Sequence, residues 1–117
     1  MTLDARLKEL LEYLVGGRLY AIATPDDPRF PLIVYQQVGG QAAWYVEKRL
    51  PDHEHSRVQI WVWANGIGQA KQISAEVERI ICESELIAEP YGAAVDDYQE
   101  QRKLYGRRQD FGVWYPR

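Results

Sequence analysis

One stretch, from Ser56 to Ser84, limits the folds available to this chain more than any other. Its first part, S-R-V-Q-I-W-V-W-A, is β-branched and aromatic, which predicts a central strand covered on both sides. After N-G-I-G, apolar residues recur at helical spacing from position 70 to 81, which predicts an amphipathic helix with Asn65 as its N-cap. We therefore expect the helix to fold back onto the strand that precedes it.

The alternation of the strand divides its side chains between two faces. One face is aliphatic and suits the helix, with Val58, Ile60 and Val62. The other face carries Gln59, Trp61 and Trp63.

Before this stretch, the sequence predicts one helix and two strands. Leucines at positions 3, 7, 10, 11 and 14 predict a one-sided helix that Thr2 caps and that the glycine pair 16–17 ends. Strands are expected over Arg18–Thr24 and over residues 31–38, on either side of the proline-rich loop P-D-D-P-R-F-P. Residues 41–55 include a charged run with a proline, and we expect them to form an exposed, mobile arm.

After the second helix, residues 85–91 and 107–115 predict two further strands, and the polar run 92–106 fits a loop or a short helical turn. The simplest packing of these elements is one α+β domain over residues 1–117, with two helices on one face of a mainly antiparallel sheet. No third layer would then cover the other face, where we expect Trp61, Trp63 and Tyr35. Uncovered apolar surface of this kind usually marks an interface.

Composition limits the functional classes. With 117 residues and 46% hydrophobic residues the chain is expected to be globular, and a net charge of −3 argues against a dedicated nucleic-acid binder. Cys82 is the only cysteine, so no disulfide can form within one chain. The first residues do not resemble a signal peptide and no run is long enough to span a membrane. We therefore expect a soluble, cytosolic protein.

Motifs that could carry chemistry are weak. In a strand, His53 and His55 would point the same way and could share a metal, but no third ligand has a suitable spacing, so a solvated loop is favoured. The G-x-G at positions 66–68 fits a tight turn better than a phosphate site. Cys82 is expected to be buried, and Arg107 and Arg108 are expected to pair with nearby acids. We expect no catalytic, cofactor or metal site.

Four segments in this order resemble the tail completion (tail terminator) proteins of long-tailed phages and prophages. They are G-G-R-L-Y, F-P-L-I-V-Y-Q-Q-V, H-S-R-V-Q-I-W-V-W-A with the helix after it, and L-Y-G-R-R-Q-D-F-G-V-W-Y. The resemblance extends from Leu7 to Tyr115. It implies an α+β fold and a ring, typically a hexamer, at the head-proximal end of the tail tube. The ring stops tube polymerisation and joins the tail to the head connector.

The resemblance also implies the partners: further copies of the chain, the tail tube protein and the head completion or connector protein, with DNA only passing through the lumen. The protein would be found in the host cytoplasm during assembly and then in the virion tail. The candidate residues for an oligomer interface are Trp61, Trp63, Tyr35 and Trp114. The candidate acids of the lumen are Glu47, Asp52, Glu54, Asp96 and Asp97. Two alternatives remain: a small domain that binds a ligand or a protein through its aromatic sheet face, and, more weakly, a metalloenzyme using His53 and His55.

Overall fold

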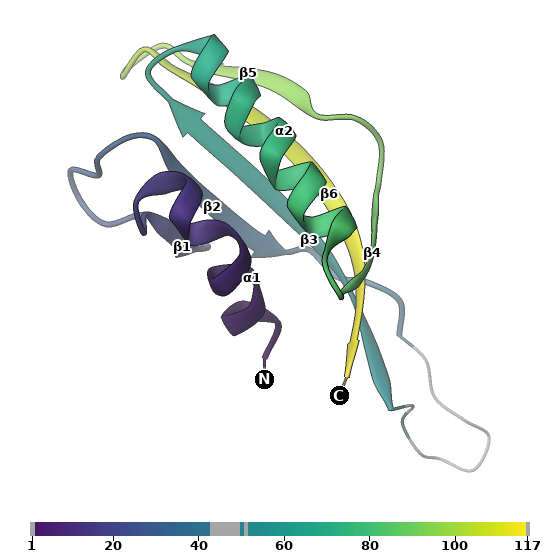
Figure 1. The fold of residues 1–117 in the computed structure, drawn as a ribbon. Coiled ribbons are helices and arrows are strands. Elements are labelled where there is room, and N and C mark those ends of the chain that lie inside the picture. Colours follow the sequence, from purple (N-terminus) through teal and green to yellow (C-terminus); the bar gives the residue numbers. More distant parts are fainter. Residues whose placement is uncertain (1, 43–49, 51, 117) are drawn as a thin grey trace.

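The computed structural model describes residues 2–42, 50 and 52–116 (Figure 1). Two α-helices, one 3-10 helix and six strands follow one another along the described chain. In order they are α1 (Leu3–Leu11), η1 (Glu12–Val15), β1 (Leu19–Ala21), β2 (Leu32–Gln37), β3 (His53–Ala64), α2 (Ile67–Glu83), β4 (Ile87–Pro90), β5 (Val95–Gln99) and β6 (Leu104–Pro116).

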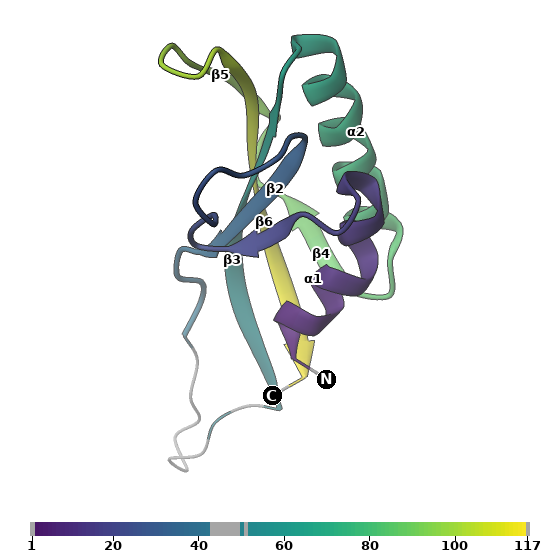
Figure 2. The same cartoon turned by 90° about the vertical axis from the view of Figure 1, so that its left-hand side faces the viewer.

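The strands form one sheet in the order β1-β2-β3-β6-β4, and β5 also pairs with β6. Only the β1–β2 pair is parallel among the strand pairs of the described residues. Both α-helices cover the same face of this sheet (Figures 1 and 2). The predicted α+β fold, with two helices on a mainly antiparallel sheet, is therefore confirmed.

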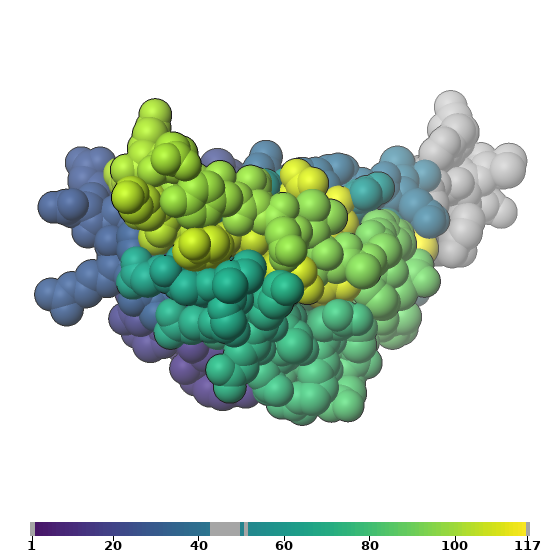
Figure 3. Space-filling view, turned by 90° about the horizontal axis from the view of Figure 1, so that it is seen from above, coloured from purple at the N-terminus to yellow at the C-terminus, as the bar shows by residue number. Residues whose placement is uncertain are grey.

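The long antiparallel pair β3–β6 forms the centre of the sheet. Its register runs from His53 opposite Pro116 to Ala64 opposite Tyr105. β4 and β5 lie one after the other along the outer edge of β6. Seen from above, the segment that contains β5 lies beside α2 on the surface (Figure 3).

The core lies between the helices and the sheet. The predicted aliphatic face of β3 is confirmed, because Val58, Ile60 and Val62 are all buried there. Leu7 and Leu11 of α1 and Val77 and Ile81 of α2 pack in the same cluster, as their helical spacing predicts. Burial of these aliphatic and aromatic side chains is the main stabilising term of the fold.

The ends of the helices agree with the sequence in two places and differ in one. The hydroxyl of Thr2 accepts a hydrogen bond from the Ala5 N–H (3.1 Å), and Gly16 ends the first helical segment in the left-handed region with φ of 59°. The prediction of Asn65 as N-cap is wrong. Gly66 occupies the cap with extended backbone, so Asn65 lies one residue too early to bind the first turn of α2.

Two segments predicted as irregular contain strands. Residues His53–His55, expected in the mobile arm, form the start of β3, because β6 continues to Pro116 and offers them backbone partners. The polar run 92–106 contains β5 and the first residues of β6. Of the expected arm, residues 43–49 and 51 lie outside the described part of the chain.

Ser56 gives a test of this packing. Its side chain is fully buried on the helix-covered face, and its hydroxyl has no hydrogen-bond partner among the described residues. Ser56→Ala should therefore leave the free energy of unfolding unchanged or raise it by about 1 kcal/mol, because a buried unsatisfied hydroxyl is costly.

Leu11→Ala is the contrasting variant, since Leu11 is fully buried among apolar groups. It should lower the free energy of unfolding by about 2–5 kcal/mol. Urea denaturation measures both. A loss of more than about 1 kcal/mol for Ser56→Ala would show that its hydroxyl is satisfied in the folded protein.

Candidate functional site

The sheet face opposite the helices carries a row of side chains that crosses five strands. Strand register aligns them, from β1 through β2, β3 and β6 to β5. The row consists of Tyr20, Val34, Trp61, Arg108 and Val95, and Trp63 lies beside Trp61. We call these six residues the aromatic stripe. Val95 is exposed and the other five are half-buried, so the described chain covers the stripe only in part.

The stripe contains two neighbouring indoles. Trp61 and Trp63 stack with ring centroids 5.5 Å apart and an interplanar angle of 4°. Gly106 makes room for Trp63, because a Cβ at this position would lie 2.7 Å from the indole ring. The Arg108 guanidinium lies 5.2 Å from the centre of the Trp61 ring. The stripe therefore presents broad aromatic surface with a cation at its centre, a combination common in protein–protein interfaces.

A second cluster lies further along the same face and is centred on His55, which is buried. Its Nδ1 accepts a hydrogen bond from the Gln41 N–H (2.9 Å), and its Nε2 lies 3.0 Å from the Tyr91 hydroxyl. Because Nδ1 is the acceptor, the neutral ring carries its proton on Nε2 and donates it to Tyr91. The ring also contacts Trp114, with centroids 4.7 Å apart.

This arrangement argues against the metal hypothesis. His53 and His55 share a face, as predicted for a strand, but both ring nitrogens of His55 are engaged within the protein. In the part of the chain that the structure describes, no three or more His, Cys, Asp or Glu side chains are grouped to hold a metal ion.

Sequence reasoning missed the role of Tyr91, which no motif marks. Tyr91 follows β4 and lies over Gly112 of β6, where a Cβ would come within 2.2 Å of the tyrosine hydroxyl. Arg57 lies 5.2 Å from the Tyr91 ring and pairs with Asp110 (2.8 Å). The glycine in F-G-V-W-Y was the available signal, since a glycine inside a strand indicates close approach of another group.

Tyr35 does not share the face of the two stacked tryptophans, so that expectation is wrong. It pairs with Ile60 and lies on the helix-covered face, where it is buried and donates a hydrogen bond to Asp4 (2.6 Å). Burial, then the hydrogen bond and charge of Asp4, raise the pKa of Tyr35 above its ordinary value. Tyr35 thus anchors α1 to the sheet. Trp114 lies on the open face with Trp61 and Trp63.

The structure does not bring the candidate lumen acids together. Asp52 directly precedes β3 and Glu54 is its second residue, whereas Asp96 and Asp97 lie on β5 at the opposite end of the sheet (Figure 1). Asp96 pairs with Arg107 (2.5 Å), as predicted for that arginine, and the hydrogen bond from Arg107 lowers the pKa of Asp96. Glu47 lies outside the described residues.

Cys82 lies on the polar outer surface of α2, so the expectation that it is buried is wrong. Cys82 is exposed rather than buried, because Ile81 takes the inward position at the end of the helix. Partial burial and the charges of Glu78 and Glu83 raise the pKa of the Cys82 thiol, which disfavours the reactive thiolate. None of the described helices is long and apolar enough to cross a membrane.

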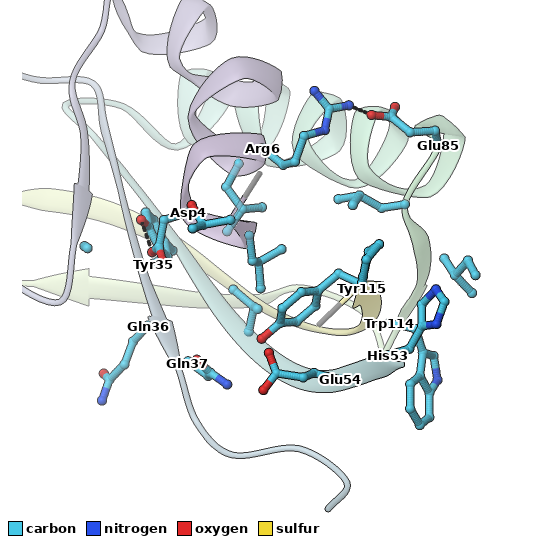
Figure 4. A pocket seen from close by; sticks show the side chains of 18 of the residues that line it. Asp4, Arg6, Tyr35, Gln36, Gln37, His53, Glu54, Glu85, Trp114 and Tyr115 are labelled. Carbon is cyan, nitrogen blue, oxygen red and sulfur yellow. Dashed lines mark hydrogen bonds and ion pairs between the residues drawn. The ribbon is translucent and has the colours of Figure 1, made fainter. Parts of the chain in front are cut away.

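A groove of about 880 Å³ opens at the end of the molecule where β3 begins and β6 ends. Figure 4 shows it below the first turn of α1, with Tyr115 and Glu54 pointing toward one another. An ion pair between Arg6 and Glu85 and the bond between Tyr35 and Asp4 lie along its wall (Figure 4). The groove wall therefore combines apolar side chains with several carboxylates.

Comparison with known proteins assigns the chain to a family. The family described as tail completion protein gp17 matches residues 2–116. The chain therefore belongs to this family of phage tail completion proteins.

A solved chain from the "Virion of native gene transfer agent (GTA) particle" has the same fold. Its TM-score is 0.60 at 17% sequence identity, and the match covers 96% of this chain and 88% of that chain. No curated protein matches the sequence.

Gly106→Ala tests whether close packing of Trp63 holds the indole stack in place. The added methyl should push the Trp63 ring off the sheet, lower the free energy of unfolding by about 1–3 kcal/mol and weaken the near-UV circular dichroism of the stacked indoles.

Gly68→Ala is the matched control, because a Cβ at this position in α2 meets no atom within 4 Å. It should raise the free energy of unfolding by up to about 1 kcal/mol and leave the indole signal unchanged. An unchanged indole signal in Gly106→Ala would contradict the packing described here.

Proposed function

We propose that this tail completion protein closes the head-proximal end of a phage tail tube as a ring of identical copies, six in number by its resemblance to the family. In this role it stops tube growth and presents a surface to the head completion or connector protein. It acts as a structural component rather than as an enzyme, in the host cytoplasm during assembly and then in the virion tail.

The observation that carries the proposal is the aromatic stripe on the open face of the sheet. The chain folds with its helices on one face only, so Trp61 and Trp63 stay partly accessible on the other. A ring of identical subunits needs two different patches on each subunit, joined head to tail. The stripe is suited to be one of them, because aromatic side chains and arginine dominate the energy of protein interfaces.

The charge of the chain is compatible with a channel for DNA. Its net charge is −3, so the bulk of the surface does not attract phosphate strongly. The candidate acids form two groups at opposite ends of the sheet. Either group, Asp52 with Glu54 or Asp96 with Asp97, is available to contribute acids to the lumen.

The double variant Trp61→Ser/Trp63→Ser tests the stripe. It should keep the far-UV circular dichroism of the folded chain but assemble poorly, since loss of a central interface tryptophan costs about 2 kcal/mol or more. Light scattering, with and without purified tail tube, should show that the variant forms rings only at a protein concentration at least about tenfold higher than the unmodified chain needs.

Tyr13→Ser is the control, because Tyr13 is 65% exposed and lies in η1, away from the open face. It should assemble as the unmodified chain does. Normal assembly of a folded double tryptophan variant would remove the stripe from the interface. Binding of a small ligand by a chain that never assembles would favour the alternative binding-domain function.

A further inference from the structure

The edges of the sheet decide whether a strand of another chain can attach to this one. β1 forms one edge, and β4 and β5 lie one after the other along the opposite edge. All five residues of β5 are exposed, so this edge is accessible. An edge strand presents outward backbone N–H and C=O groups on which another strand can pair. Pairing therefore depends on how many of these outward groups are still unbound.

On β5, an outward N–H is already bound within the chain. The Tyr91 N–H binds the Asp110 carbonyl (2.8 Å), so the even-numbered residues of β6 direct their backbone groups toward β4 and β5. Asp97 pairs with Gly106, and by alternation the backbone groups of Tyr98 point outward. The Asp97 carboxylate accepts a hydrogen bond from the Tyr98 N–H (2.8 Å). This carboxylate therefore takes the place of the carbonyl that an added strand would supply.

β4 is short of outward donors for two further reasons. Pro90 points outward by the same alternation and has no N–H. Just before the strand, the outward N–H of Leu86 binds the Ser84 hydroxyl (3.2 Å). Ala88 is therefore the only residue of β4 with an outward N–H.

The opposite edge, β1, is closed by hydrogen bonds at its two ends. Backbone groups of Arg18 and Ile22 bind β2, so those of Leu19 and Ala21 point outward. The Leu19 N–H binds the Gly17 carbonyl (3.0 Å), and the Ala21 carbonyl accepts a hydrogen bond from the N–H two residues further along (2.7 Å). β1 thus keeps one outward N–H and one outward carbonyl, which are too few for a ladder.

Charged side chains also oppose pairing on the edge formed by β4 and β5. Glu89, Asp96 and Asp97 lie on these two strands and are exposed. Arg107 pairs with Asp96, which leaves the charges of Glu89 and Asp97. Two copies that joined along this edge would bring like charges together, which destabilises a strand pair.

We propose that both edges of the sheet are closed against strand addition, so that neighbouring copies meet this chain through side chains on its faces. The closure stands on hydrogen bonds and charges within one chain, whereas the statement about copies rests on the ring proposed above. Closed edges are suited to a ring, because an open edge favours association without a fixed end point.

Asp97→Val tests the closure, because it removes the acceptor of the Tyr98 N–H. Asp96 and Tyr98 then offer two successive outward N–H groups on β5. The folded variant should form thioflavin-T-positive aggregates at a several-fold lower concentration than the unmodified chain. Pro90→Val restores an outward N–H on β4 and should act in the same direction. Unchanged onset concentrations in both folded variants would overturn the closure.

Two matched controls separate the backbone N–H from charge and from apolar surface. Asp97→Asn removes the charge but keeps a side-chain oxygen within reach of the Tyr98 N–H. Gln99→Val adds the same apolar side chain to β5, but the Gln99 N–H faces β6. Both should aggregate as the unmodified chain does. Aggregation of either control at the low concentration found for Asp97→Val would overturn closure through the Tyr98 N–H.

Ala88→Pro tests whether copies avoid this edge in the ring. It removes the last outward N–H of β4, and proline is tolerated on an edge strand. Rings should form at the same concentration as with the unmodified chain, and loss of rings by a folded variant would show that copies pair through β4. Failure of the unmodified chain to assemble, even with tail tube present, would contradict the ring but not the closure, which Asp97→Val decides.

Discussion

The pairing of β3 with β6 is the constraint on which the rest of the structure depends. These two strands exchange backbone hydrogen bonds from His53 opposite Pro116 to Ala64 opposite Tyr105, and the other elements attach to them. Because side chains alternate, the same register that buries Val58 and Phe111 under the helices places Trp61 beside Arg108 on the open face. One pairing therefore sets both the core and the candidate interface.

The same pair also makes the two ends of the molecule different. At one end β3 and β6 extend beyond the helices and leave the groove, and at the other β5 adds a strand that carries Asp96 and Asp97. A subunit with unlike faces and unlike ends is suited to head-to-tail association, which closes into a ring when the rotation between copies permits. A subunit with unlike faces and unlike ends is compatible with membership in the tail completion family.

The sequence predicted those features that depend on local periodicity. The strand with Trp61 and Trp63, the helix after it, and the Thr2 cap follow from spacing within one segment. Features that depend on pairing between distant segments were missed. β5 is mostly polar and all five of its residues are exposed, so its pairing with β6 rather than its composition makes it a strand.

Tyr35 shows for a single residue that the sequence does not reveal pairing between distant segments. Alternation within β2 gives two sets of side chains, but only the register with Ile60 decides which set faces the helices. The cluster of His55, Tyr91 and Trp114 likewise joins three strands or their ends, and neither spacing nor motif connects them. The groove arises because β3 and β6 extend beyond the helices. No single segment of the sequence indicates it.

Electron microscopy of purified tail tubes mixed with this protein tests the central claim most directly. We expect a ring of density at one end of each tube and no further elongation of capped tubes when tube protein is added. Bare tube ends at saturating protein, with elongation continuing as in its absence, would contradict the account.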